Sequence, residues 1–236
     1  MNKYLDFLAL FGIGGAHPGG FNLTKKIFQL ERLKSSTMVL DIGCGTGQSA
    51  AHLKHKYNCE VTAIDSHPLM LQKAKSRMET LGLDVKLFEN NAEDLTFGDN
   101  QFDYVLSESV LSFTKAEKSL KEISRVLKPG GILIAIEMTN EGNLTNDQKK
   151  ELQSFYGIKQ IYDELEWKQT IKKAGFSEVK VKDDQFMLTD ENEVNGSEFQ
   201  LSPDIPPKYV EILDQHEFYT LKYKNQLGYR IYRCVL

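Results

Sequence analysis

A carboxylate and three glycines in the segment VLDIGCGTGQS, residues 39–49, form the strongest candidate for a chemical site. The spacing is D-x-G-x-G-x-G, with Asp41 two positions before Gly43. Glycines there allow positive φ and a close approach of ligand to backbone, and the start of a following helix offers unpaired N–H groups. A dinucleotide-binding loop has the spacing GxGxxG, but Gln48 stands at its third place here. A carboxylate beside the loop suits an ammonium group better than a pyrophosphate, so we predict a ligand with a positively charged end.

The elements that position this loop alternate along the chain between short apolar strands and amphipathic helices. Short apolar runs bounded by glycines or polar residues predict strands, and apolar residues at helical spacing predict helices. The predicted strands are residues 38–41, 60–65, 85–89, 102–107, 132–137, 178–186 and 228–236. The predicted helices are residues 48–57, 68–81, 116–127, 147–156 and 167–174, with another within 207–223. Lys-Pro-Gly-Gly at residues 128–131 is expected to close the third of these helices and turn the chain.

Short strands separated by helices of this length are typical of a parallel sheet with right-handed crossovers. We therefore predict an α/β fold with a doubly wound, Rossmann-like sheet. Ligands of such sheets bind outside the carboxyl ends of the strands. The candidate regions are accordingly residues 41–47, 65–70, 90–94 and 107–109.

Composition excludes several classes of protein. The chain has 236 residues, a net charge of −4 and 26% charged residues, which gives no electrostatic basis for binding nucleic acid or an anionic membrane. An apolar run at residues 5–13 is too short to span a bilayer. Cys44, Cys59 and Cys234 are scattered, which argues against disulfides and a zinc site and favours a reducing, cytoplasmic setting. We expect no metal site, and the sequence assigns no oligomeric state.

Five segments resemble the class I S-adenosylmethionine-dependent methyltransferases, in particular the small-molecule branch that includes ubiquinone/menaquinone-type enzymes. In order, between about residues 36 and 140, they are VLDIGCGTG, AIDSHPLML, NNAEDLTF, FDYVLSESVLSF and VLKPGGILIAIE. The resemblance implies S-adenosylmethionine as cofactor and S-adenosylhomocysteine as product. With it, the full prediction is a mostly parallel seven-stranded sheet with an antiparallel last strand, an N-terminal lid and helical cap segments. Residues 1–35 would form the lid loop and a helix, 36–140 the cofactor-binding core, and 141–236 the rest of the same domain.

The resemblance also implies which residues bind the cofactor. Asp41 and the glycine loop would hold the methionine part, and Asp65 would accept both ribose hydroxyls, because a carboxylate has two oxygens. Ser66 and Met70 would flank the adenine, while Asn91 stands where many relatives have Asp, so its amide must turn the carbonyl toward the adenine amine. The full predicted set is Asp41, Gly43, Cys44, Gly45, Gly47, Asp65, Ser66, Met70, Asn91, Ala92, Glu93 and Ser107.

Several of these residues have a structural alternative. Asp65 could cap the helix that starts near Pro68, and Glu108 could contact substrate or cofactor or could form a structural hydrogen bond. Cys44 has no base partner and is not expected to act as a nucleophile. His52 and His55 are expected to be solvated on the outer face of a helix, and Trp167 to anchor the core. For His216, packing on a helix face is favoured over a role as a base, although that helix could cover the substrate.

The glycine-rich segment GIGGAHPGGFNLTKKIF, residues 12–28, precedes the first predicted strand and so cannot be the loop of the sheet. A helix is expected from Asn22 or Leu23, with Leu23, Ile27 and Leu30 on one buried face. In related enzymes a flap in this place lies across the methionine end of the cofactor. We predict that residues 12–20 form such a lid, ordered on binding, with His17 facing the transferring methyl group or the acceptor. The alternative is that residues 16–20 form only a tight turn that starts the helix, with His17 exposed. His17 and Glu108 are the predicted catalytic residues.

The predicted reaction is in-line transfer of a methyl group to a small-molecule acceptor, for which the protein must mainly align the reactants and exclude water. Two alternatives stay open: a non-catalytic, cofactor-binding regulatory protein, and a nucleotide-dependent oxidoreductase, which the glycine spacing opposes. Aromatic residues of the irregular segments could line an apolar acceptor pocket, namely Tyr156, Tyr162, Phe186, Tyr209, Phe218 and Tyr219.

Overall fold

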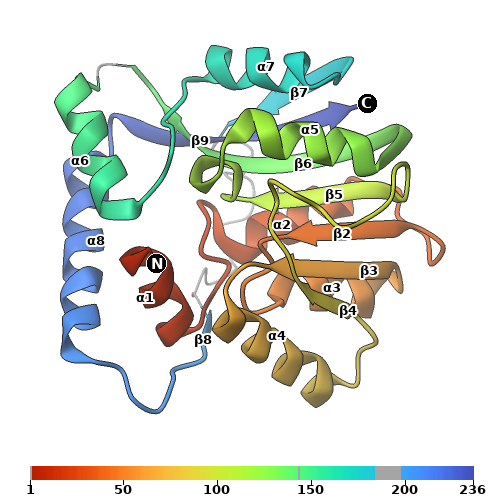
Figure 1. The fold of residues 1–236 in the computed structure, drawn as a ribbon, viewed down its shortest axis with the longest axis horizontal. Helices are drawn as coiled ribbons and strands as arrows, with labels where there is room; N and C mark the ends of the chain where they lie inside the picture. The colour runs from red at the N-terminus through yellow and green to blue at the C-terminus, as the bar shows by residue number, and fades with distance from the viewer. Residues whose placement is uncertain (1, 143, 184–197) are drawn as a thin grey trace.

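A seven-stranded sheet runs through the centre of the computed structural model, which describes residues 2–142, 144–183 and 198–236 (Figure 1). The strand order is β4-β3-β2-β5-β6-β9-β7. Their bounds are β2 Met38–Ile42, β3 Glu60–Asp65, β4 Lys86–Glu89, β5 Phe102–Glu108, β6 Leu127–Asn140, β7 Glu178–Lys182 and β9 Leu227–Val235. The pairs from β4 to β6 are parallel, whereas β9 is antiparallel to both β6 and β7. The predicted sheet, with its antiparallel last strand, is confirmed.

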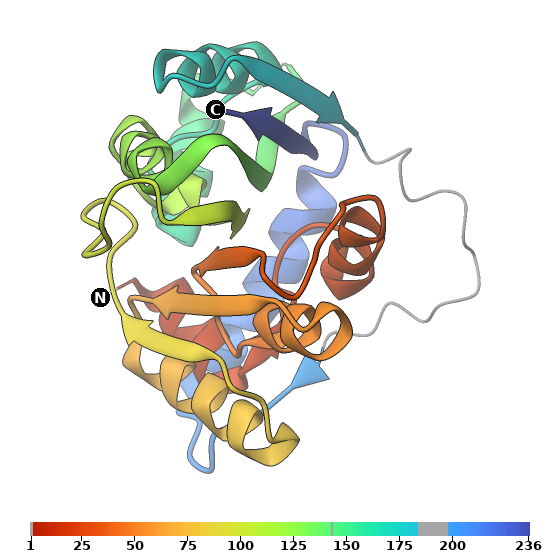
Figure 2. The same ribbon diagram turned by 90° about the vertical axis from the view of Figure 1, so that its right-hand side faces the viewer.

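Helices cover both faces of this sheet, because neighbouring strand residues point to opposite sides. On β2, Val39 packs with α2 and α3 while Leu40 packs with α5 and α7. Figure 2 shows α5 and the pair α2 and α3 on opposite sides of the row of strands. The bounds are α2 Gly20–Gln29, α3 Gln48–Tyr57, α4 Pro68–Leu81, α5 Ala116–Val126 and α7 Glu164–Lys173. Trp167 is fully buried in the second of these layers, as predicted.

Three helices form a separate cap beside the carboxyl ends of the parallel strands (Figure 1). They are α1 Lys3–Phe11, α6 Asn146–Tyr156 and α8 Val210–Lys222, the last preceded by the 3-10 turn η3 Pro207–Tyr209. An apolar cluster of its own holds the cap together, and it includes Met70 at the start of α4. The predicted helix within 207–223 is confirmed, while α1 was not predicted.

The N-terminal segment differs from the prediction in three respects. The helix α2 begins at Gly20, earlier than expected, and Leu30 beyond its end is 61% exposed, so only Leu23 and Ile27 of the predicted face are buried. Residues Ile13–Gly14 form a short strand, β1, which pairs antiparallel with β8, Glu198–Phe199. No local pattern in the chain predicts this pairing, because its partners are 184 or more residues apart.

The starts of two further elements, β6 and α7, differ from the predicted ones for local reasons. The strand β6 already begins at Leu127 and runs through the Lys-Pro-Gly-Gly segment, so that segment is an irregular stretch of strand rather than a turn. The helix α7 begins at Glu164, before the predicted start, because Asp163 and Glu166 form a reciprocal capping box. The predicted strand over 178–186 is seen from Glu178 to Lys182, and its last residues, including Phe186, lie outside the described part of the chain.

All three cysteines are free and buried. Among the described helices, none is long and apolar enough to cross a membrane. The division of the chain at residues 35 and 140 stays a prediction.

Candidate cofactor site

The glycine loop between β2 and α3 is held in a conformation that side chains would disrupt. Gly43 and Gly47 have φ of 67° and 76°, and a Cβ would lie 2.4 Å from Val110 Cγ2 at the first and 2.8 Å from Met78 Cε at the second. Gly45 also has a positive φ, but a Cβ there would meet nothing within 4 Å. Packing therefore requires glycine at two positions, and the middle one borders open space that a ligand can approach.

Asp41, at the base of this loop, is a buried carboxylate that lacks a full set of partners. It is 1% exposed, and its Oδ2 has no hydrogen-bond partner in the described structure. Burial raises the pKa of Asp41 well above its ordinary value, and the nearby carboxylates Glu108 and Asp65 raise it further, against one opposing backbone N–H from Ala50. A cationic ligand group beside Oδ2 would stabilise the ionised form.

Asp65 links the glycine loop to the start of α4. Its Oδ2 accepts the Gly45 N–H at 2.8 Å and its Oδ1 accepts the His67 N–H at 2.8 Å. Burial raises the pKa of this carboxyl, and these backbone N–H groups oppose the shift. Asp65 thus partly fills the structural role considered for it at the start of α4, yet each of its oxygens keeps a second lone pair for a ligand hydroxyl. Ser66 beside it is exposed, and Met70 is buried on the cap side.

Four buried polar atoms without partners lie near the carboxyl ends of β2, β3 and β5. They lie at the ends of β2 and β5 or at the starts of the helices after β2 and β3: Asp41 Oδ2, Gln48 Oε1, His67 Nδ1 and Ser107 Oγ. Buried polar groups are normally satisfied, and exceptions mark places where a ligand, ion or water belongs. Sequence analysis missed Gln48 and His67, because nothing local distinguishes a helix-start Gln or His from a solvated one.

The loop after β4 is fixed by its own contacts. Asn91 is exposed, and its Oδ1 accepts the Glu93 N–H at 2.9 Å. Ala92 is buried, and Glu93 Oε1 accepts the Lys115 N–H at 3.0 Å. The side-chain carbonyl of Asn91 thus accepts one hydrogen bond within its own loop, and its second lone pair is free to accept from an adenine amine.

His17 and Glu108 meet in a buried polar cluster between the N-terminal segment and the end of β5. His17 is 8% exposed, so the alternative of an exposed histidine in a turn is wrong. Its Nε2 lies 3.2 Å from Glu108 Oε1, which also accepts the Thr24 hydroxyl, while Ser49 Oγ donates to Glu108 Oε2 at 2.6 Å. The other ring nitrogen, Nδ1, lies 3.1 Å from the Pro18 carbonyl. Both ring nitrogens of His17 thus lie within hydrogen-bond distance of an oxygen atom.

Glu137, on β6, is a further buried carboxylate that sequence analysis did not select. It accepts the Leu111 N–H at 2.9 Å, the Ser112 N–H at 3.1 Å and the Ser112 hydroxyl at 2.7 Å. Burial raises its pKa to about 7, against these three donors. It thereby holds the turn η1, Leu111–Phe113, which follows the end of β5. A lone Glu in the apolar strand ILIAIE was the signal that could have identified it.

The remaining sequence candidates are structural. Cys44 is buried, and burial raises the pKa of its thiol, which opposes a nucleophilic role. His55 is exposed as predicted, but His52 is not solvated: it packs edge-on against Phe21 and Tyr57, and burial lowers its pKa to about 4. His216 packs in the cap, as predicted, with Nδ1 3.2 Å from the Tyr156 hydroxyl.

The aromatic candidates for an acceptor pocket divide by burial. Tyr156 is buried in the cap, Tyr209 and Tyr219 pack against it, and Phe218 is exposed. Tyr162 packs instead against Trp167, in the layer of α5 and α7. Three of the six predicted residues therefore belong to the aromatic core of the cap near the strand ends.

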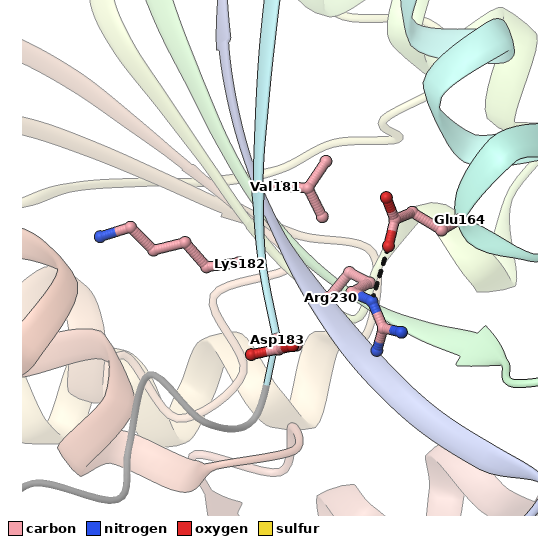
Figure 3. Close-up of a pocket in the computed structure, with 5 residues that line it drawn as sticks. All are labelled: Glu164, Val181, Lys182, Asp183 and Arg230. Atoms are coloured by element: carbon pink, nitrogen blue, oxygen red, sulfur yellow. Dashed lines mark hydrogen bonds and ion pairs between the residues drawn. The ribbon is translucent and has the colours of Figure 1, made fainter.

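No group of three potential metal ligands occurs in the described residues. A pocket of about 350 Å³ lies elsewhere, on α7, β7 and β9, where Arg230 Nε donates to Glu164 Oε2 at 3.0 Å (Figure 3). It contains none of the predicted site residues.

Comparison with known proteins places this geometry among methyltransferases. A family model described as a methyltransferase domain matches residues 39–131. The uncharacterized methyltransferase YodH of Bacillus subtilis is 39% identical over 233 residues, which cover 98% of each chain. A demethylmenaquinone methyltransferase of Thermus thermophilus is 39% identical over 106 residues, 44% of this chain and 48% of that protein.

Solved structures with the same fold are more distant in sequence. Phosphoethanolamine N-methyltransferase 2 of Haemonchus contortus, in complex with S-adenosyl-L-methionine, has a TM-score of 0.74 at 21% identity. The match covers 99% of this chain but 56% of that one, so this chain spans little more than half of that enzyme. The [4+2]-cyclase SpnF has a TM-score of 0.71 at 20% identity, covering 99% of this chain and 92% of its own. At these identities the likeness concerns the fold alone.

Proposed function

This chain belongs to the class I S-adenosylmethionine-dependent methyltransferases, and we propose that it transfers the methyl group to a small-molecule acceptor. The observation that carries the proposal is the buried, unpartnered Asp41 Oδ2 beside the glycine loop. An ammonium group there would supply the missing counter-charge, and the amino-acid end of S-adenosylmethionine carries one.

The residues around the loop fit the rest of the cofactor. Asp65 would hold the ribose, since each of its oxygens keeps a free lone pair beside its backbone N–H bond. Gly45 would let the cofactor approach the backbone, and Ser107, with its unpartnered Oγ, would face it from the end of β5. Ser66, Met70, Asn91, Ala92 and Glu93 would form the adenine side, with Gly43, Cys44 and Gly47 shaping the loop.

When bound, S-adenosylmethionine supplies an electrophilic methyl group, so this chain has to align an acceptor and exclude water. Alignment of that kind can lower a barrier by about 7–11 kcal/mol. The predicted catalytic pair, His17 and Glu108, would contribute by holding the N-terminal segment over the site, through the contact of His17 Nε2 with Glu108 Oε1 at 3.2 Å. The prediction that His17 faces the acceptor itself stays untested.

We propose an uncharged, apolar or aromatic acceptor. The cap beside the strand ends is built from aromatic and aliphatic side chains, and no Lys or Arg is buried anywhere in the described residues. A phosphorylated acceptor would need such a cation to offset its charge. We further propose the cytoplasm as the compartment, which the three free cysteines support.

Calorimetric titration with S-adenosylmethionine tests the cofactor half of the proposal. The wild type should bind, and Asp41→Asn and Asp65→Ala should each bind more weakly by about tenfold or more, the effect of one charge-assisted hydrogen bond. Glu60→Gln, an exposed carboxylate at the other end of β3, is the matched control and should bind like the wild type. Absence of binding by the wild type, or unchanged binding by both variants, contradicts the proposal.

Incubation with methyl-labelled cofactor and a metabolite extract tests the transfer step. A labelled, uncharged small molecule identified by mass is the expected product. A labelled product that carries a phosphate would contradict the acceptor class alone. Binding of the cofactor with no labelled product in any extract would favour the non-catalytic, regulatory alternative, and a response to NAD(P)H without cofactor binding would favour the oxidoreductase.

A further inference from the structure

A segment far along the chain lies against the N-terminal glycines. We call residues 12–20 the cover segment and residues 198–202 the strap. Within the pairing of β1 with β8, Gly14 stands opposite Glu198, and the pairing continues through Gln200 N–H to the Gly12 carbonyl at 3.0 Å. The Ser202 N–H donates to the Leu10 carbonyl at 2.8 Å, so the strap runs antiparallel to the cover from end to end of the pairing.

The cover segment packs against the glycine loop between β2 and α3, which we call the cofactor loop. A Cβ at Gly14 would be 3.1 Å from Gln48 Oε1 and 3.2 Å from Thr46 Oγ1, and a Cβ at Gly15 would be 3.2 Å from the same Gln48 oxygen. Contacts this short leave little room for a side chain. The glycines at these two positions therefore allow the cover to pack against the start of α3.

Glu198 of the strap also contacts the start of α3, through Gln48. One of its oxygens, Oε2, accepts from Gln48 Nε2 at 2.9 Å and pairs with Arg77 at 2.9 Å. Arg77 in turn donates through Nε to the Thr46 carbonyl at 2.8 Å. A carboxylate can only accept, so Glu198 fixes the Gln48 amide with its NH2 toward the strap and its oxygen away from it.

We propose that Glu198 is a positioning residue for the cofactor loop, acting through Gln48 and Arg77 to hold Thr46–Gln48 and the cover segment in their binding conformation. This inference rests on the proposed function, because it concerns the same cofactor. A preorganised loop loses less conformational freedom on binding, so loss of Glu198 should weaken binding and speed release. Because Glu198 is 38% exposed, its ion pair contributes little to global stability, and the two effects are separable.

The experiment compares Glu198→Ala, Glu198→Gln and Arg77→Ala with the control Lys75→Ala, which lies on the same helix as Arg77. Lys75 pairs with Glu79 at 4.0 Å and both side chains are exposed, so the Lys75→Ala substitution removes a charge from α4 without changing a contact to the loop. The measurements are the S-adenosylmethionine Kd by calorimetry, its dissociation rate, the melting temperature, and amide exchange at residues 12–16 and 43–49.

Glu198→Ala should raise the Kd about tenfold, the effect of one charge-assisted hydrogen bond, with faster dissociation and an unchanged melting temperature. Amide exchange should accelerate at both measured segments and nowhere else. Glu198→Gln, which keeps an acceptor oxygen, should show a smaller change. Glu198→Ala combined with Arg77→Ala should lose little more than either alone, since both act through Thr46 and Gln48.

A Kd for Glu198→Ala equal to that of the wild type overturns the inference, as does an equal loss in Lys75→Ala. A lower melting temperature with accelerated exchange throughout the molecule also overturns it, since the role would then be general stabilisation. Failure of the wild type itself to bind S-adenosylmethionine would instead contradict the proposed function, so the two failures are distinguishable.

Discussion

Replacing Glu137 with Gln should change how stability depends on pH. Burial raises the pKa of Glu137 from 4.5 to about 7, so between these values the folded protein binds a proton that the unfolded chain has released. Stability must then fall as pH rises through this window, because ionisation favours the unfolded state. For these two pKa values the loss between pH 5 and pH 8 is about 2.5 kcal/mol.

Glu137→Gln removes this titration while keeping nearly the same shape. Its carbonyl can still accept the Leu111 N–H, but its NH2 group cannot accept from Ser112, so we expect a cost of about 1–3 kcal/mol at every pH. The difference in unfolding free energy between wild type and variant should therefore shift by about 2.5 kcal/mol in favour of Gln from pH 5 to pH 8.

Urea unfolding of both proteins at the two pH values measures this shift, and every other titrating group cancels in the difference. A difference in stability that stays constant from pH 5 to pH 8 would refute the reasoning. Glu137 would then be ionised in the folded protein over the whole range, with its three donors fully offsetting burial.

Three further variants or measurements test the site. Gly12→Ala should destabilise the protein more than Gly82→Ala. Both glycines have φ near +60°, but a Cβ at Gly12 would clash with the Gln200 carbonyl, whereas a Cβ at Gly82 would meet no atom within 4 Å. Equal unfolding free energies of the two variants in urea would contradict this. His17→Ala should lower the unfolding free energy by about 1–3 kcal/mol, since it removes one donor to the buried Glu108; unchanged stability, turnover and cofactor affinity would remove His17 from the site. Cofactor binding should release protons, because a cation beside Asp41 lowers a pKa that burial has raised; calorimetry in two buffers of different ionisation enthalpy measures this, and identical enthalpies would contradict it.

Much of the fold was predictable because its signals are local. The strand at residues 38–42 and its glycine loop follow from eleven consecutive residues, and the alternation of strands and helices gave the parallel sheet. Which of the predicted residues bind the cofactor stays a prediction, but the structure brings Asp41, Asp65 and Ser107 to the carboxyl-end edge of the sheet, as their positions at strand ends require.

What could not be predicted depends on contacts between distant parts of the chain. Gln48 and Glu198 are 150 residues apart, and His17 and Glu108 are 91 apart, so neither pair leaves a pattern in sequence. Glu137 differs, since a carboxylate in an otherwise apolar strand buried on both faces has to find donors. Its partners, on a turn 25 residues earlier, were still not deducible.

The three carboxylates around the loop differ in how their charge is compensated, and this difference argues for the kind of ligand the site takes. Glu108 has two hydroxyl donors and the His17 ring, and Asp65 has two backbone N–H groups. Asp41 alone keeps one oxygen without a partner. A buried carboxylate of that kind is strongly unfavourable when ionised. A hydrogen-bond donor beside Asp41 Oδ2 would relieve this cost, most strongly if it carries a positive charge, whereas an anionic ligand would add to it, and this difference favours an ammonium-bearing cofactor over a pyrophosphate.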